Sequence, residues 1–213
     1  MHRFLTLGRA GVLTAILGMW LLVSGHAVAV AANPDAESFA QRLIDQGVGI
    51  LRDRSDPQRR AKFREFIMQY ADARKTAIFA LGNYKRGASD ADVEAYVQAF
   101  TAYATAVYES RLDQYKGQTL KVVGSTDNRP GDVTVNMIVV DPAARQPLRV
   151  AFRLLGGGGS YRFVDVQVEG IWLSIEQREQ FAGFLSQNGG NVPRLTAHLT
   201  AQAQQINSGT AQR

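Results

Sequence analysis

The side chains that carry acid–base or nucleophilic chemistry are few and widely spaced in this sequence. It has no cysteine and three histidines, two of which, His2 and His26, lie in an amino-terminal segment that we expect to be removed. The lack of cysteine excludes disulfides, zinc ribbons, iron–sulfur clusters and a cysteine nucleophile. The third histidine, His198, has no serine or carboxylate motif beside it, so we interpret it as a surface or structural residue.

Asp165 and Glu169 are the carboxylates whose spacing comes nearest to a catalytic pair. On one strand they lie about 13 Å apart, whereas paired glycosidase carboxylates are separated by about 5–9.5 Å. We therefore expect both on the outer, solvated face, paired with Arg149 and Arg153. The glycine run at residues 156–159 lacks the Gly-Lys-Ser/Thr ending of a phosphate loop and connects two strands, so it predicts a hairpin loop.

The amino terminus has the features of an export signal. Arg3 and Arg9 precede an apolar run of 14 residues, Ala10–Val23, and Ala27-Val28-Ala29 follows as a small-residue cleavage site. This order is typical of a cleavable signal peptide, and the run is shorter than a spanning helix, which needs about 20 residues. We expect residues 1–29 to be removed and residues 30–213 to form one exported domain with a small positive charge.

Helical periodicity fills the first half of the mature chain. Asp35–Arg52 predicts one helix, Asp56-Pro57 starts a second, a short segment follows at Ala73–Leu81, and Ser89 opens the longest helix, which ends near Tyr115. Aromatic residues recur along these segments at the spacing of an apolar helix face. They are typical of an ordinary core, and they also suit a cavity if the apolar faces do not close.

After the long helix the apolar residues alternate with polar ones, which is the pattern of half-buried strands. Four such strands, joined by turns at residues 127–132, 141–147 and 156–159, predict an antiparallel meander. Two further helices follow, one opened by Ser174 and the other by Asn191. The predicted fold is α+β, with helices packed on one face of a curved four-stranded antiparallel sheet.

The densest basic stretch is residues 52–64. It places Arg59, Arg60 and Arg64 on the predicted second helix, on the side away from its aromatic residues. One interpretation is a solvated helix face, and the other is a docking surface for an acidic partner or anionic lipid headgroups. We expect these three arginines to contribute to docking rather than to ligand binding.

The stretch Phe163–Gly170, with the sequence Phe-Val-Asp-Val-Gln-Val-Glu-Gly, resembles the aromatic-x-Asp-Val-x-Val-Glu-Gly signature of the MlaC family. These proteins are periplasmic lipid-binding components of a phospholipid transport system. The order of elements around the signature is also similar, from the export signal to Gln177-Arg178-x-x-Phe181. Asn83-Tyr84 departs from the Tyr-Trp pair of many members, and Trp172-Leu173 looks closer to the hopanoid-associated HpnM branch.

The resemblance implies a helix-covered sheet that encloses a pocket for lipid tails. It implies a periplasmic carrier that shuttles a phospholipid or hopanoid between the inner and outer membranes, without catalysis, cofactor, metal or nucleic acid. The implied partners are an inner-membrane lipid transporter and an outer-membrane lipoprotein. The side chains expected to line the pocket are Phe66, Tyr70, Phe79, Phe100, Tyr103, Val107, Val135, Met137, Val150, Phe152, Val166, Val168 and Phe181.

Two other classes of protein stay open at this point. A small-molecule enzyme on a cone-shaped α+β fold of the ketosteroid-isomerase type needs an aspartate base and a tyrosine donor in its pocket. The acids of this sequence are instead expected at caps, at turns or on the outer strand face. A structural interaction module has apolar faces that close completely, so a cavity in the structure separates it from the carrier and the enzyme.

Overall fold

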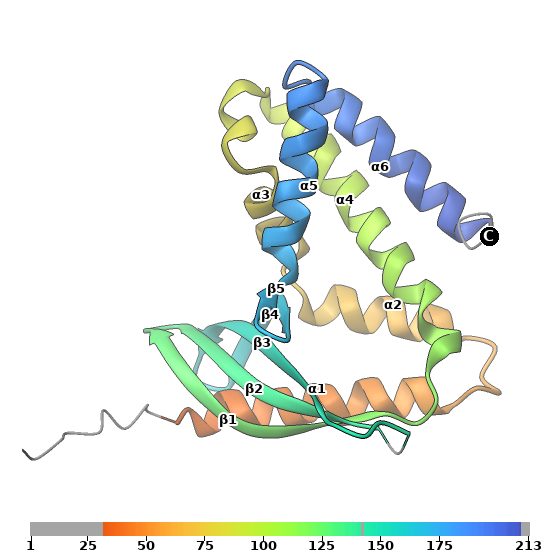
Figure 1. Cartoon of the computed structure of the whole chain (residues 1–213), viewed down its shortest axis with the longest axis vertical. Helices are drawn as coiled ribbons and strands as arrows, with labels where there is room; N and C mark the ends of the chain where they lie inside the picture. The colour runs from red at the N-terminus through yellow and green to blue at the C-terminus, as the bar shows by residue number, and fades with distance from the viewer. Residues whose placement is uncertain (1–31, 142, 210–213) are drawn as a thin grey trace, which may run out of the picture.

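The structure, a computed structural model, describes residues 32–141 and 143–209, so the expected export signal at residues 1–29 lies outside the described part (Figure 1). Helices come first, then an antiparallel sheet, then two more helices, which is the predicted order. The elements are α1 (Pro34–Arg52), α2 (Arg59–Tyr70), α3 (Ala73–Leu81), the 3-10 segment η1 (Gly82–Gly87), α4 (Asp90–Ser110), η2 (Leu112–Gln114), β1 (Thr119–Arg129), β2 (Asp132–Val140), β3 (Leu148–Gly157), β4 (Ser160–Val168), β5 (Ile171–Trp172), α5 (Leu173–Gln187) and α6 (Val192–Asn207). Among these helices, none is both long and apolar enough to cross a membrane.

Most helices begin at a side chain that accepts a hydrogen bond from the first turn. Asn33 caps α1 by accepting from Ala36 N at 3.0 Å, and Ser89 caps α4 by accepting from Asp92 N at 3.1 Å. Asn191 caps α6 in the same way. Helix α5 differs, because the side chain of its N-cap residue, Trp172, makes no capping hydrogen bond. The predicted N-cap residue, Ser174, lies inside the first turn of the helix.

The sheet is an antiparallel meander with the strand order β1-β2-β3-β4-β5. This confirms the α+β class and the curved antiparallel sheet, with five strands instead of four. The predicted turn at residues 127–132 is shorter, because β1 continues to Arg129 and only Pro130 and Gly131 connect it to β2. The glycine run forms the predicted hairpin, in which Gly158 and Gly159 both have positive φ.

The extra strand β5 explains the Glu-Gly end of the signature. Glu169 and Gly170 have φ values of 48° and 88° and form the two-residue turn between β4 and β5. Glu169 is held in this left-handed conformation by Arg149, whose backbone N and Nη2 donate to its carboxylate at 2.6 and 3.0 Å. The expected pairing of Glu169 with Arg149 is therefore confirmed.

Strand β4 contains a bulge that simple alternation does not predict. Arg153 of β3 pairs with Asp165, yet the next residue, Leu154, pairs with Phe163, so Val164 is an extra residue in β4. Phe163 consequently shares the inner face of the sheet with Leu154. The alternation in the sequence had placed Phe163 on the outer face.

The bulged part of β4 also anchors the helices above the sheet. The carbonyl oxygen of Phe163 accepts from Asp72 N at 2.8 Å, and that of Val164 accepts from Thr76 Oγ1 at 2.7 Å. These two bonds hold the start of α3 against β4. In Figure 1, α3, α4, α5 and α6 stand above the layer formed by the sheet and α1.

Two separate hydrophobic cores result from this arrangement. The lower core lies between α1 and the inner face of β2 and β3, and its buried side chains include Phe39, Leu43, Val135 and Leu154. The upper core lies between α3, α4, α5 and α6. Helix α2 and strand β4 lie where the two parts meet, and this boundary is where a ligand cavity can form.

The sheet contains an ion pair with a buried carboxylate, and its contribution to stability depends on pH. Arg153 donates to both carboxylate oxygens of Asp132, at 2.9 and 2.7 Å, and Asp132 is only 2% exposed. Hydrogen bonds from Arg153, aided by Asn128, hold the pKa of Asp132 below its ordinary value despite the opposing effect of burial. A lowered pKa in the folded protein means that the stabilisation is present above the unfolded pKa, about 3.9, and is lost as pH falls through the folded pKa.

We expect Arg153→Gln to lower the free energy of unfolding by about 1–2 kcal/mol at pH 7, because Arg153 is partly solvated and Arg129 also pairs with Asp132. Urea denaturation at pH 7 and in acid, below the lowered pKa, measures this difference. The matched control is Arg149→Gln, which removes an exposed partner of Glu169 and should have a smaller effect. An equal loss at both pH values would contradict the assignment to Asp132.

Candidate functional site

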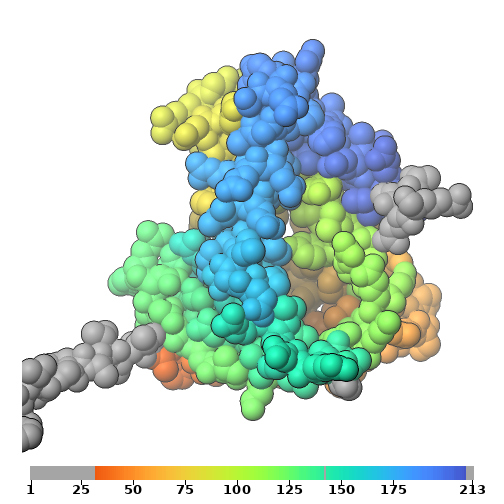
Figure 2. Space-filling view, in the orientation of Figure 1, coloured from red at the N-terminus to blue at the C-terminus, as the bar shows by residue number. Residues whose placement is uncertain are grey.

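An apolar cavity of about 430 Å³ lies between the two cores. Its walls come from α1, α2, α4, the inner side of β3 and β4, and the starts of α3 and α5. Figure 2 shows a hollow bounded by α4, α5 and the adjoining ends of β2 and β3, with atoms of α2 visible at its back. The apolar faces of the elements therefore do not close completely, which argues against a fully packed interaction module.

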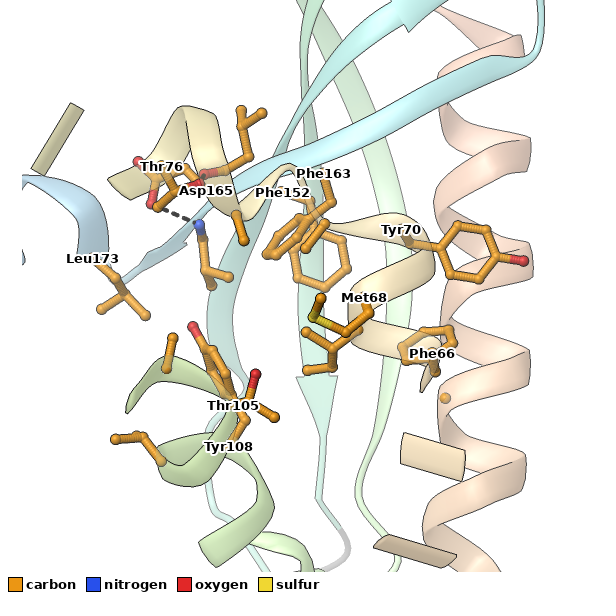
Figure 3. A pocket seen from close by; sticks show the side chains of 18 of the residues that line it. Phe66, Met68, Tyr70, Thr76, Thr105, Tyr108, Phe152, Phe163, Asp165 and Leu173 are labelled. Atoms are coloured by element: carbon orange, nitrogen blue, oxygen red, sulfur yellow. Dashed lines mark hydrogen bonds between the residues drawn. The ribbon is translucent and has the colours of Figure 1, made fainter. Parts of the chain in front are cut away.

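Seven of the thirteen predicted lining residues border this cavity. They are Phe66, Tyr70, Phe100, Tyr103, Val107, Phe152 and Val166. Figure 3 shows Phe152 of β3 beside Phe163 of β4, with Met68 of α2 facing them and Phe66 of the same helix nearer α1. The rings of Phe152 and Phe163 meet edge to face with centroids 5.1 Å apart, so together they form an aromatic wall.

The other six predicted residues lie elsewhere, and each is a correction. Val135 and Met137 are buried beneath α1 with Val150 packed beside them, because α1 covers that half of the inner face. Phe181 belongs to the upper core, where its ring meets that of Tyr96. The two that remain lie outside both cores: Phe79 is 40% exposed, with the guanidinium of Arg178 over its ring, and Val168 pairs with Ile171 of β5.

Several lining residues were not predicted from the sequence. Phe163 reaches the cavity because of the β4 bulge, which leaves no mark in the alternation of residues. Met68 lies outside the apolar stripe of α2 and is 51% exposed at the cavity. Leu43 and Leu51 lie on the apolar face of the first helix. This face is long, and its length is the signal in the sequence that it borders a cavity as well as the sheet.

One end of the cavity is polar. The carboxylate of Asp165 accepts from Val166 N at 2.9 Å, from Ser174 N at 3.1 Å and from the hydroxyl of Ser174. Asp165 is therefore the capping group of α5, and its 9% exposure corrects the expectation of a solvated carboxylate paired with Arg153. Figure 3 shows Asp165 and Thr76 at one side of the cavity and Tyr108 of α4 on another.

Tyr108 borders the open space, which leaves 38% of its surface exposed. Desolvation by the surrounding walls raises the pKa of the Tyr108 hydroxyl, and the negative charge of Asp165 raises it further. The tyrosine, neutral at physiological pH even with its ordinary pKa of about 10, stays neutral here. It offers a hydrogen-bond donor near the polar end of an otherwise apolar cavity.

The lining holds one charged side chain, Asp165, and no lysine, arginine or histidine. The described residues contain no group of three or more His, Cys, Asp or Glu side chains placed to bind a metal ion. Because its carboxylate is engaged by three hydrogen bonds, Asp165 serves the fold. The geometry suits the burial of an apolar chain.

The predicted docking arginines fasten α2 to the end of α4. Arg59, only 9% exposed, donates to the carbonyl of Leu112 at 2.7 Å, which corrects the expectation that it faces solvent. Arg60 pairs with Asp113 at 2.6 Å. Arg64 donates to both carboxylate oxygens of Glu109 at 2.6 and 2.9 Å, and Glu109 is buried. These pairs fix the separation of α2 and α4, which form facing walls of the cavity.

The fold and the cavity define an α+β protein with an apolar pocket between a curved sheet and a layer of helices. The chain belongs to the MlaC family, since the model of that family, described as MlaC protein, matches residues 41–201. That span includes α2 to α5 and the whole of the cavity lining. The resemblance carried by the signature at Phe163–Gly170 is thereby confirmed at the level of the family.

A solved structure of a phospholipid-binding protein from Ralstonia solanacearum, in complex with a phospholipid, has the same fold. The two chains share 21% sequence identity, and the superposition covers 81% of this chain and 99% of the other with a TM-score of 0.66. At this level of identity the similarity establishes the shared architecture.

Proposed function

We propose that this protein is a lipid carrier that holds the acyl or polycyclic part of a phospholipid or hopanoid in the cavity between its two cores. The observation that supports the proposal best is the cavity itself, which is apolar and about 430 Å³ in volume. Single-ligand pockets measure about 300–1,000 Å³. Membership of the MlaC family and the phospholipid bound to the Ralstonia solanacearum protein support the same conclusion.

The energetics of lipid transfer explain why such a cavity is needed. Each methylene removed from water contributes about 0.8 kcal/mol, so a 16-carbon chain loses about 13 kcal/mol when it leaves a bilayer for water. A carrier must restore most of that burial within its own walls. Aromatic and aliphatic side chains such as Phe66, Phe152 and Val107 supply these walls.

The carrier acts in the periplasm, after export directed by residues 1–29, and moves its lipid between the inner and outer membranes. It receives and delivers lipid through an inner-membrane transporter and an outer-membrane lipoprotein. Family membership supports this assignment. Of the three docking arginines, Arg60 and Arg64 stay in the proposal, because 53% and 57% of their side-chain surfaces remain exposed beside their acidic partners.

A transfer assay between vesicles tests the carrier function. Donor vesicles with a labelled phospholipid are mixed with unlabelled acceptor vesicles, and the mature protein should raise the transfer rate in proportion to its concentration. If the protein binds the lipid but the transfer rate does not change with protein concentration, the function is restricted to lipid storage. The absence of both binding and transfer would refute the proposal.

A second candidate is an enzyme of the ketosteroid-isomerase kind, because the structure places Asp165 and Tyr108 in the same cavity. The hydrogen bonds to Asp165 favour its role as the cap of α5 over that of a proton acceptor for a ligand. The two functions differ in the fate of the ligand. A carrier releases the supplied lipid unchanged in mass and retention time, whereas an enzyme releases an altered molecule.

A further inference from the structure

A second cavity, of about 410 Å³, adjoins the apolar one. It lies between α1, the end of α2 and the β3–β4 hairpin, and Leu43 and Tyr70 line both cavities. Its lining combines the aromatic residues Phe39, Tyr70 and Tyr161 with the exposed polar residues Arg42, Gln46 and Arg162, and it includes no aspartate or glutamate. A basic cavity thus lies directly beside an apolar one.

The two arginines of the second cavity have no acidic partner among residues 32–141 and 143–209. Arg162 is fixed by donating from Nη1 to Gln69 O and from Nη2 to Ala71 O, both at 2.9 Å. A guanidinium has five N–H donors, so three stay available on Arg162. Arg42 lies over the ring of Phe39 with its guanidinium carbon 5.8 Å from the centroid.

Tyr70 borders both cavities. Its ring packs against Phe66 of the apolar cavity and Phe39 of the basic one, with centroids 5.3 and 6.1 Å away. Its hydroxyl donates to Gln46 Oε1 at 3.0 Å, on the side of the basic cavity. Figure 3 shows the Tyr70 hydroxyl pointing away from the aromatic wall of Phe152 and Phe163.

From this juxtaposition we infer that the basic cavity binds the anionic, phosphate-bearing headgroup of the lipid whose chain occupies the apolar cavity. The inference rests on the proposed carrier function and specifies the ligand as an anionic amphiphile. The apolar cavity has no cationic side chain that could pair with a phosphate, and its one charged side chain, Asp165, repels an anion. The guanidinium groups of Arg42 and Arg162 match phosphate in charge and in hydrogen-bond geometry.

The test compares two single-chain probes with the same 16-carbon tail, lysophosphatidic acid and monoacylglycerol, which differ in the phosphate. Each competes with a fluorescent fatty alcohol bound to the mature protein. We expect the phosphate to raise affinity about tenfold or more, since charge-assisted hydrogen bonds are among the strong ones. In Arg42→Gln/Arg162→Gln this preference should fall to within about twofold, with the affinity for monoacylglycerol unchanged.

The matched control is Lys85→Gln/Arg86→Gln, which removes the same charge from η1, away from both cavities. It should keep the full preference. Because Arg162 also holds the end of α2, Arg42→Gln is measured alone as well, and its loss of preference supports the inference even if the double variant does not fold.

Three results would overturn the inference. A preference for phosphate that survives both Arg42→Gln and the double variant would place the headgroup elsewhere. If inorganic phosphate or glycerol 3-phosphate stabilised the protein against thermal unfolding as much as lysophosphatidic acid does, the site would be assigned to a free anion. Loss of binding to an acidic partner protein, with the phosphate preference intact, would make the arginines a docking surface. Failure of both probes to bind would instead refute the carrier function itself.

Discussion

Replacing Ala104 by tryptophan is expected to expel the lipid while leaving the protein folded. Ala104 lies on α4, is half-buried and borders the apolar cavity, so an indole at this position projects into the open space. Loss of room for only two methylenes costs about 1.6 kcal/mol, which is more than tenfold in affinity. We expect lipid occupancy to fall by at least that factor, with Tm unchanged to within about 3 °C.

The matched control is Ala102→Trp, two residues away on the same helix, where the side chain is exposed and borders neither cavity. It introduces the same bulk and should leave both lipid occupancy and Tm unchanged. Extraction and quantification of bound lipid, together with thermal unfolding, measure both variants. Unfolding of Ala104→Trp would show that the space is part of a packed core.

Asp165→Asn is expected to destabilise the protein without changing the ligand. The carboxylate of Asp165 caps α5 through Ser174 and also accepts from Val166 N, and Asp165 is 9% exposed. An amide has the same shape but only one acceptor oxygen and no charge. We expect a loss of about 2 kcal/mol in the free energy of unfolding. At this chain length that loss corresponds to a fall in Tm of about 4–8 °C.

The matched control is Glu169→Gln, in the same signature but on an exposed turn, where the change in stability should be smaller. Chemical denaturation gives the free energies, and bound lipid is quantified in parallel. A stable Asp165→Asn variant that accumulates a chemically different ligand would identify Asp165 as a catalytic group. That outcome would contradict the assignment of Asp165 as a structural cap and would support the enzyme.

The fold was largely predictable because its signals are local. Capping residues such as Ser89 and Asn191 mark the helix starts, and period-two alternation marks β2 and β3. The two-residue strand β5 was not predictable, because it depends on Glu169 adopting positive φ, and Arg149 holds it there from another strand. A conformation stabilised by a distant partner leaves no periodic signal in the sequence.

The site was only partly predictable, because periodicity shows which side of an element is apolar but not what covers it. Val135 and Phe152 pair directly across β2 and β3, and both are apolar inner-face residues. Helix α1 buries Val135 completely, whereas Phe152 borders the cavity. Phe163 shows a second reason, since a single extra residue in β4 moved it from the outer to the inner face.

The arginines of α2 illustrate a third reason. The sequence shows a basic cluster but not the acids that face it, because Glu109, in α4, and Asp113, in η2, lie about 50 positions further along the chain. Only the fold brings them together. The same cluster that suggested a docking surface therefore ties α2 to the end of α4 and to η2.

Native mass spectrometry of the protein, purified from its native cells without detergent, tests the carrier function most directly. The account predicts a folded protein with a mass increment equal to one lipid, which tandem mass spectrometry identifies as an intact membrane lipid. The increment should be absent from Ala104→Trp and present in Ala102→Trp. A folded wild-type protein that carries no lipid, and takes none up from vesicles, would contradict the account.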